Sequence, residues 1–220
     1  MISFNQVNEG LLENSPMVTL NGLEKKFGTQ HILRNITHTF ESGSKTVVLG
    51  SNGSGKSTLI KIISGAVEAS NNPPEYNFNK PVAANEAGKY CSMAAPYMAL
   101  NPMFTLTETL SFHEKMCGFA KNALISEWVE KAGLSKHQSK RIQTYSSGML
   151  QRVRLLMAIA SDRSLLLLDE PTSNLDTDGV QFYKHLIEHF TLDKTVIVAS
   201  NYVKREYAFC DSELILEKHY

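Results

Sequence analysis

The chain has 220 residues, and its 22 Lys and Arg balance 22 Asp and Glu, so the formal net charge is zero. This length suits one domain with a sizeable core, and we expect residues 1–220 to form a single domain. The charge balance argues against nucleic acid as the main partner, because nucleic-acid-binding proteins are usually basic. The three cysteines are scattered, without C-x-x-C or metal-ligand spacing, which indicates reduced thiols.

The sequence gives no sign of a segment that enters a membrane. Residues 1–16 lack a basic start followed by an apolar core, so we expect no signal peptide. No apolar run approaches the ~18 residues that a membrane-spanning helix needs. Any role at a membrane is therefore expected to depend on a partner protein.

The first half of the chain predicts strands, one helix and a long connection. Strands are expected at 17–20, 32–40 and 45–50. Apolar residues then recur at helical spacing from about Lys56, and Gly65 is a stop signal. Prolines and asparagines in residues 65–89 are typical of a loop or short edge strands.

The second half predicts a mainly helical insert, about 96–157, between two parts of an α/β core. We expect helices at 104–119, 123–132 and 179–190, and strands at 90–95, 164–168 and 195–200. The strand at 164–168 is almost pure leucine, as expected for a strand buried on both faces. The core would comprise about 17–95 and 158–216.

A glycine-rich loop follows the third predicted strand and opens the first predicted helix. It matches G-x-x-x-x-G-K-[ST], the pattern of a phosphate-binding loop. Glycines let successive N–H groups point at phosphate oxygens, and the helix N-terminus adds a positive dipole. Lys56 would reach the β- and γ-phosphates, and the Ser57 hydroxyl would bind Mg²⁺. The nucleotide-binding residues are expected to be Gly50, Ser51, Asn52, Gly53, Ser54, Gly55, Lys56, Ser57 and Thr58.

Two carboxylates come directly after the leucine-rich strand. Ligands of open α/β sheets lie beyond the carboxyl ends of the strands, so Asp169 and Glu170 can both face a nucleotide. We expect Asp169 to hold Mg²⁺, directly or through water. Glu170 would orient and partly deprotonate the attacking water, because phosphoryl transfer depends on positioning and charge stabilisation.

A second serine-glycine turn, YSSGM at 145–149, precedes a predicted helix, and SNLD follows the carboxylates at 173–176. With these four motifs in order, the sequence resembles the ATP-binding subunits of ABC transporters over about 18–216. The family's LSGGQ signature corresponds to YSSGM, and its D-loop to SNLD. The resemblance implies an α/β fold: a P-loop NTPase core with a mainly parallel sheet, N-terminal antiparallel strands and an inserted helical subdomain.

The resemblance also implies a head-to-tail dimer that holds two ATP molecules. Each ATP would lie between the phosphate loop of one copy and Ser146, Ser147 and Gly148 of a second copy or a homologous ATPase subunit. Phe27 occupies the place of an aromatic residue that stacks on adenine. The helical insert would dock on a membrane-spanning permease, which places the subunit in the cytoplasm, on the cytoplasmic face of the membrane.

Several positions depart from the family pattern. Ser147 replaces the first glycine of the signature, and Met149 replaces its glutamine. The Q-loop glutamine is missing, and we align Ala95 with it, with Ala94 as the alternative. The switch histidine, a catalytic residue, corresponds to Asn201, which can donate a hydrogen bond but cannot carry a proton. Slow but real ATP hydrolysis is expected.

Two other functions stay open at this stage. One is a soluble ABC ATPase that acts outside transport, although such proteins usually carry two motif sets or a long coiled coil, and this chain has neither. The other is a regulatory subunit that binds ATP and hydrolyses little, for which Ala95 and Asn201 are the motivation. The leading hypothesis is the ATPase of a transporter.

Overall fold

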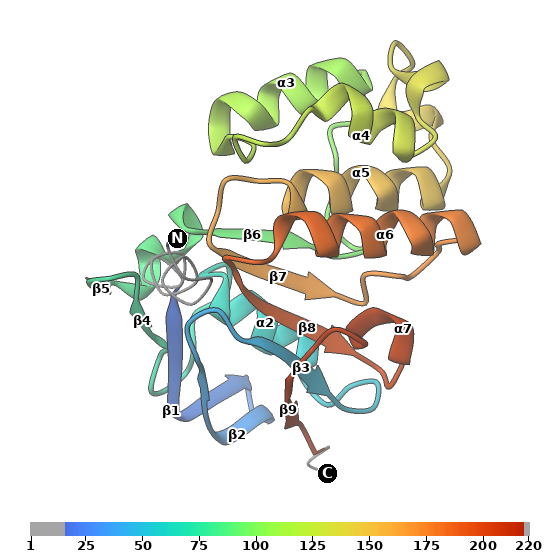
Figure 1. Ribbon diagram of the computed structural model, residues 1–220. Coiled ribbons are helices and arrows are strands. Elements are labelled where there is room, and N and C mark those ends of the chain that lie inside the picture. Colours follow the sequence, from blue (N-terminus) through green and yellow to red (C-terminus); the bar gives the residue numbers. More distant parts are fainter. Residues whose placement is uncertain (1–15, 218–220) are drawn as a thin grey trace.

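The computed structural model describes residues 16–217. Two sheets and the helices that cover them make up this part of the chain (Figure 1). The expectation about a signal peptide concerns residues that lie almost entirely outside this range. None of the helices in the described part is long and apolar enough to span a bilayer.

A five-stranded parallel sheet forms the centre of the fold. Its strands, in spatial order, are β6 (Cys91–Ala94), β7 (Leu165–Asp169), β8 (Thr195–Ser200), β3 (Lys45–Leu49) and β9 (Ser212–Ile215). Every residue of β7 and of β8 is buried. Alternate residues of β7 belong to different cores: Leu165 and Leu167 face one cluster, and Leu166 and Leu168 face the other. The leucine run is thus explained by burial on both faces.

A four-stranded antiparallel sheet covers one side of this centre. Its strands, in order, are β2 (Gln30–Phe40), β1 (Met17–Phe27), β4 (Glu75–Asn77) and β5 (Pro81–Val82). Between the two sheets lies α2 (Lys56–Ile63), whose buried face joins β1 and β2 in one apolar cluster with Leu165, Leu167 and Ile197. This cluster fixes the direction in which α2 leaves the parallel sheet.

Longer helices cover the other face of the parallel sheet. They are α5 (Ser147–Ile159) and α6 (Thr177–Phe190), and α3 (Leu106–Cys117) and α4 (Ile125–Lys131) lie beyond α5 (Figure 1). The remaining helical segments are α7 (Lys204–Tyr207), η1 (Ala84–Lys89), η2 (Ser135–His137) and η3 (Ile142–Thr144). Trp128 of α4 packs against Phe182 and Phe190 of α6, so the insert shares its core with the sheet-covering helices.

Local sequence explains where these helices begin. Thr105 and Glu108 form a reciprocal capping box at the start of α3. Ser146 accepts a hydrogen bond from the backbone N–H of Met149 and so caps α5, and Asp176 caps α6 in the same way. The cap at Asp176 sets the start of α6 two residues before the expected helix.

The expected α/β fold is confirmed. The strand at 45–50, the helix from Lys56 and the short edge strands within 65–89 are all present. Strand β1 extends to Phe27, beyond the expected end at residue 20. Strand β9 was not expected from the sequence. It is exposed along most of its length and pairs only with β3 among the described strands, so its own pattern carried little signal.

Candidate functional site

The carboxyl ends of three neighbouring strands meet at one edge of the parallel sheet. Strand β8 pairs with β3 on one side and β7 on the other, and the registers place Leu49 beside Ser200 and Asp169 beside Ala199. The residues that follow these strands are therefore brought together. They are the glycine-rich loop after β3, the carboxylates at the end of β7, and Asn201 after β8.

The glycine-rich loop wraps around the ammonium of Lys56. Lys56 is only 5% exposed, and its Nζ donates hydrogen bonds to the carbonyls of Gly50 (2.7 Å) and Ser51 (3.1 Å). Gly55 has φ 99°, and a Cβ there would lie 2.7 Å from Cδ2 of Leu33. Only glycine fits this position without strain. Burial lowers the pKa of Lys56, and the nearby carboxylates, first Glu170 and then Asp169, oppose that effect.

Asp169 has one oxygen engaged and one without a partner. The hydroxyl of Tyr97 donates to its Oδ2 at 3.0 Å, whereas Oδ1 is buried and has no hydrogen-bond partner. Burial, and then Asp169 itself, raise the pKa of the Tyr97 hydroxyl, so the phenol remains a donor. An unpartnered buried carboxylate oxygen is costly, and a bound cation would remove that cost.

Glu170 has a strained backbone at the mouth of the site. Its φ is 44°, a left-handed conformation that is uncommon outside glycine, and its N–H donates to the carbonyl of Ala199 at 2.9 Å. Residues in such conformations tend to be held at functional positions by the structure around them. The turn directs the Glu170 side chain to the same cavity as the glycine-rich loop.

A cavity of about 500 Å³ lies over the glycine-rich loop, a size suited to a small-molecule ligand. Glu170 and Asn52 also line an adjoining hollow of about 250 Å³, which includes Asn201. Phe27 is 54% exposed, and it pairs with Gln30, which borders the larger cavity. The residues that line the larger cavity are Gln30, Ile32, Asn52, Gly53, Gly55, Lys56, Ser57, Thr58 and Glu170.

The remaining residues of the glycine-rich loop, Gly50, Ser51 and Ser54, support the cavity without lining it. Gly50 lies so close to Ser54 that a Cβ on the glycine would meet the serine Oγ, and Ser54 is buried with its Oγ unpartnered. Ser51 contributes the carbonyl that binds Lys56. These residues keep the loop tight and do not line the cavity.

The serine-glycine turn lies elsewhere on the surface of the chain. Ser146 and Ser147 are exposed, and neither they nor Gly148 line the cavity over the glycine-rich loop. A Cβ on Gly148 would lie 2.9 Å from the carbonyl oxygen of Asn174, so the turn is packed against the segment that follows the carboxylates. Within one copy, the structure does not bring the turn to the glycine-rich loop.

Side chains of α5 connect this turn to neighbouring loops. Arg152 forms a 2.5 Å ion pair with Asp176 and donates to the carbonyl of Ala132 at 2.7 Å. Gln151 is fully buried and donates to the carbonyl of Pro171 at 3.0 Å. Helix α5 is therefore tied to the residues that follow Glu170.

Sequence reasoning missed Tyr97 as a residue of this site. Ala95, aligned with the missing glutamine, is fully buried and carries no polar group, whereas Tyr97 reaches Asp169. A phenol three residues beyond the end of a sheet strand is a weak signal, because its direction depends on a turn in which the N–H of Met98 donates to the carbonyl of Ala95.

Glu206 was also missed. It is 3% exposed, and its carboxylate accepts hydrogen bonds from Ser200 (2.5 Å) and from the hydroxyl of Thr172 (3.0 Å). Burial raises the pKa of this carboxyl group. Glu206 thereby ties the loop after β7 to the loop after β8.

The residues present fit a magnesium ion that is bound together with a nucleotide. Among the described residues, no group of three or more His, Cys, Asp or Glu side chains could hold a metal ion. A cation here would therefore need oxygen ligands from a phosphate chain in addition to Asp169 and Ser57. Magnesium binds in this way, through one or two protein ligands and substrate phosphates.

The fold and the cavity define a P-loop nucleotide-binding protein. A family model described as ABC transporter matches residues 33–173. The chain belongs to this family, as one of its ATP-binding proteins. It is 32% identical over 212 residues to the Bacillus subtilis uncharacterized ABC transporter ATP-binding protein YdbJ, covering 92% of this chain and 67% of that protein. It is 30% identical to the Bacillus subtilis linearmycin resistance ATP-binding protein LnrL, with the same coverage.

Solved structures show the same fold at lower sequence identity. An ATP-binding subunit of an ABC transporter superposes with a TM-score of 0.79 at 22% identity, covering 91% of this chain and 85% of that one. The dimeric structure of MJ0796, a bacterial ABC transporter cassette, gives 0.75 at 20% identity, with 91% and 94% covered. The family membership predicted from the four motifs is confirmed.

Proposed function

We propose that this chain binds Mg-ATP over the glycine-rich loop and hydrolyses it to power a transporter. The observation that carries the proposal is the buried, unpartnered Oδ1 of Asp169, whose carboxylate acts on Lys56 and whose neighbour in sequence, Glu170, lines the cavity together with Lys56 and Ser57. A cation would bind the unpartnered oxygen of Asp169, and a phosphate chain would fill the cavity beside Lys56. Members of the family bind ATP, and ATPase activity is general among them.

Each residue has a role that follows from its chemistry. Lys56 exchanges its bonds to the loop carbonyls for phosphate oxygens, and the loop N–H groups bind the same phosphates. Ser57 and Asp169 would hold Mg²⁺, which when bound neutralises charge that develops on the phosphates. Glu170 orients the attacking water and accepts its proton. Phe27, exposed at the end of β1, supplies a ring for adenine to stack on.

Asn201 is the residue that we expect to make ATP hydrolysis slow. It borders the same hollow as Glu170, where its amide can donate a hydrogen bond to the γ-phosphate. An amide cannot become cationic, so it stabilises developing charge less than a protonated imidazole would. We therefore expect hydrolysis that is slow yet dependent on Glu170.

The second wall of the ATP site would come from another copy of the chain or from a homologous subunit. Ser146, Ser147 and Gly148 lie at the start of α5, where the exposed N–H groups of a helix N-terminus favour an anion. They do not reach the glycine-rich loop of their own chain. A head-to-tail pair would bring them to the partner's ATP, and pairing itself is supported by the similar cassette MJ0796, whose structure is dimeric. ATP would favour closure of the pair, and hydrolysis would release it.

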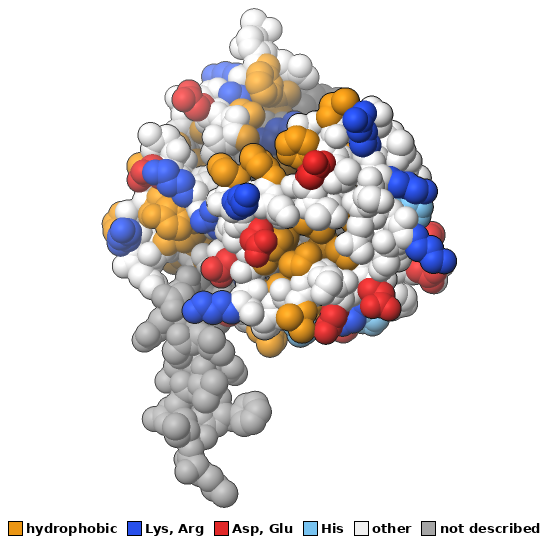
Figure 2. All heavy atoms as spheres, turned by 90° about the horizontal axis from the view of Figure 1, so that it is seen from above, with side chains coloured by type: hydrophobic (Ala, Val, Ile, Leu, Met, Phe, Trp, Pro, Cys, Tyr) orange, Lys and Arg blue, Asp and Glu red, His pale blue; other side chains and the backbone are white. Residues whose placement is uncertain are grey.

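The insert, about 96–157, is the surface that we assign to a membrane-spanning permease. Figure 2 views the side of α3 and α4 and shows apolar side chains among charged ones. Phe112 and Met116 on α3 are 56% and 63% exposed, and Leu124 before α4 is 62% exposed. Binding to the permease would place the chain on the cytoplasmic face of the membrane. Nucleic acid is not an expected partner, since the net charge is zero.

Steady-state release of phosphate by purified protein tests the enzymatic part of the proposal. Wild-type protein is expected to release phosphate from Mg-ATP, and Glu170→Gln should reduce the rate by at least about 100-fold, because the amide cannot accept a proton. Glu188→Gln, on the exposed face of α6, is the matched control and should keep the wild-type rate. Equal rates for wild type and Glu170→Gln would exclude the assigned role.

A further inference from the structure

Tyr97 joins three parts of the nucleotide site. It lies in the connection between β6 and α3, and its hydroxyl donates to Oδ2 of Asp169 at the end of β7. Its ring lies under Nζ of Lys61 in α2, at 4.2 Å from the ring centroid. Tyr97 thus contacts both Asp169 and the helix after the glycine-rich loop. A change in the position of either one would alter the contacts of this tyrosine.

The contact with Asp169 leaves that carboxylate in one orientation. Because Tyr97 engages Oδ2, the free oxygen is Oδ1, which is buried and unpartnered. A carboxylate at the end of a strand could otherwise rotate about its terminal bond, since that torsion is broad. The phenol thus selects the orientation in which one oxygen is open to a cation. Hydrogen bonds from outside partners orient metal ligands in the same way in other proteins.

The residue after Tyr97 is bound to the helix that carries the serine-glycine turn. The carbonyl oxygen of Met98 accepts a 2.7 Å hydrogen bond from Nε of Arg154 in α5. Arg154 also approaches Gln151 at 3.4 Å, and Gln151 donates to the carbonyl of Pro171. Two hydrogen bonds, joined by the covalent chain between Tyr97 and Met98, therefore connect Asp169 to α5.

We propose that Tyr97 is a positioning residue that orients Asp169 for the metal and links the state of the metal site to α5. The inference rests on the proposed function, because it presumes that Mg-ATP binds there. Ala95, aligned with the missing glutamine, has no polar side-chain group with which to contact Asp169. In this chain Tyr97 makes that contact. A metal ion held by Asp169 would shift the hydrogen bond from Tyr97, and Met98 would transmit that shift to Arg154.

The first test is the metal dependence of nucleotide binding at equilibrium. The binding of a fluorescent ATP analogue to wild type, Tyr97→Phe and Tyr90→Phe is measured while Mg²⁺ is titrated. The measurement is then repeated in EDTA. Tyr97→Phe keeps the ring under Lys61 and removes only the hydroxyl. Tyr90 lies at the opposite end of β6, so Tyr90→Phe is the matched control. The half-saturating Mg²⁺ concentration should rise by about 10-fold to 100-fold in Tyr97→Phe alone, with unchanged affinity in EDTA.

Three outcomes are informative in this titration. An unchanged Mg²⁺ midpoint in Tyr97→Phe overturns the inference. Equal losses of affinity with Mg²⁺ and in EDTA also overturn it, because they indicate general damage to the site. If wild-type protein binds no nucleotide at all, the proposed function fails instead, and this result is distinguishable from the other two.

Hydrogen exchange tests the link to α5. Addition of Mg²⁺ to the nucleotide-bound protein should increase the protection of amides in Ser147–Ile159 of wild type and Tyr90→Phe. In Tyr97→Phe, at Mg²⁺ concentrations that saturate each protein, that increase should be lost. The same increase in all three proteins would contradict the link from Tyr97 to α5.

Discussion

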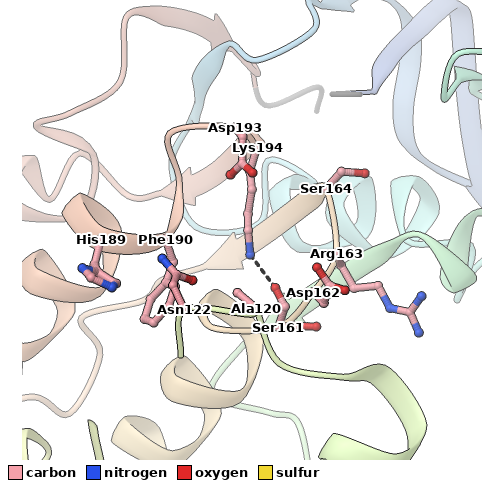
Figure 3. A pocket seen from close by; sticks show the side chains of 10 residues that line it. All are labelled: Ala120, Asn122, Ser161, Asp162, Arg163, Ser164, His189, Phe190, Asp193 and Lys194. Atoms are coloured by element: carbon pink, nitrogen blue, oxygen red, sulfur yellow. Dashed lines mark hydrogen bonds between the residues drawn. The ribbon is translucent and has the colours of Figure 1, made fainter. Parts of the chain in front are cut away.

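Replacing Lys194 with methionine should remove a contribution to stability that increases between about pH 8 and pH 10.5. Lys194 is 5% exposed, and its Nζ donates to the carbonyls of Ile159 (2.8 Å) and Ser161 (2.6 Å) at the end of α5. Figure 3 shows the Lys194 side chain directed at Ser161. Both residues line a cavity of about 350 Å³. Burial lowers the pKa of Lys194 to about 8, although Asp193 and Asp162 oppose the shift.

The sign of the effect follows from proton binding. Between about pH 8 and 10.5 the folded protein has lost the proton of Lys194 and the unfolded chain still holds it, so the contribution of Lys194 to stability rises with pH. At about 1.4 kcal/mol per pKa unit, the full rise is about 3 kcal/mol. Below about pH 8 both states are protonated, and the folded state carries the whole cost of the buried charge.

Urea denaturation at a series of pH values measures this contribution as a difference between two proteins. Burial raises the pKa of Cys91 to about 11 and of Cys210 to about 12, which lowers stability as pH rises above 9. Both proteins retain these thiols, so their effect cancels in the difference. Methionine cannot donate to the two carbonyls, and this loss adds an offset that is independent of pH.

The difference in unfolding free energy, wild type minus Lys194→Met, should increase by about 3 kcal/mol across this range. Lys184→Met, on the exposed face of α6, should show no such increase. Parallel pH profiles for wild type and Lys194→Met would contradict this prediction, because they would mean that burial of the ammonium has no free-energy cost.

Three further changes have defined outcomes. Gly55→Ala should lower stability by about 1–3 kcal/mol, because φ is 99° and the added Cβ meets Leu33; an unchanged melting temperature in calorimetry would contradict this. Asn201→His should raise kcat for ATP hydrolysis by about 10-fold or more, and a rate at or below wild type would oppose its assigned role. Burial raises the pKa of Glu206 above 4.5, so the contribution of Glu206 to stability falls as the pH rises above 4.5. Glu206→Gln should therefore make the melting temperature fall less steeply with pH in thermal denaturation. A pH profile identical to that of wild type would exclude the raised pKa.

The parts of the fold that the sequence predicted are those with a strong local pattern. In three segments the local pattern of apolar residues matches the pattern of burial. These segments are the β-branched run before Gly50, the helix that begins at Lys56 and the leucines before Asp169. Hydrophobic periodicity and glycine spacing report such burial directly. Asp169 and Glu170 could be placed near the loop because parallel strands end at the same edge of a sheet.

The parts that the sequence did not predict depend on contacts between distant residues. Tyr97 and Asp169 are 72 positions apart, and Glu206 and Thr172 are 34 apart. Hydrophobic periodicity does not reveal either contact, because the direction of each side chain depends on the geometry of turns that the sequence pattern does not predict. Asn201 and the serine-glycine turn were identified through family resemblance, and their roles remain proposals.

We propose that the serine-glycine turn of one copy completes the ATP site of another. Mixing two inactive variants, Lys56→Ala and Gly148→Asp, in equal amounts and measuring phosphate release tests this arrangement. A head-to-tail pair of unlike copies contains one site with an intact Lys56 and an intact Gly148, so the mixture should recover activity that neither variant shows alone. A protein that carries both substitutions, mixed with an equal amount of either variant, should recover none. If the mixture of the two variants stays inactive while the variants pair with each other, the shared site is contradicted.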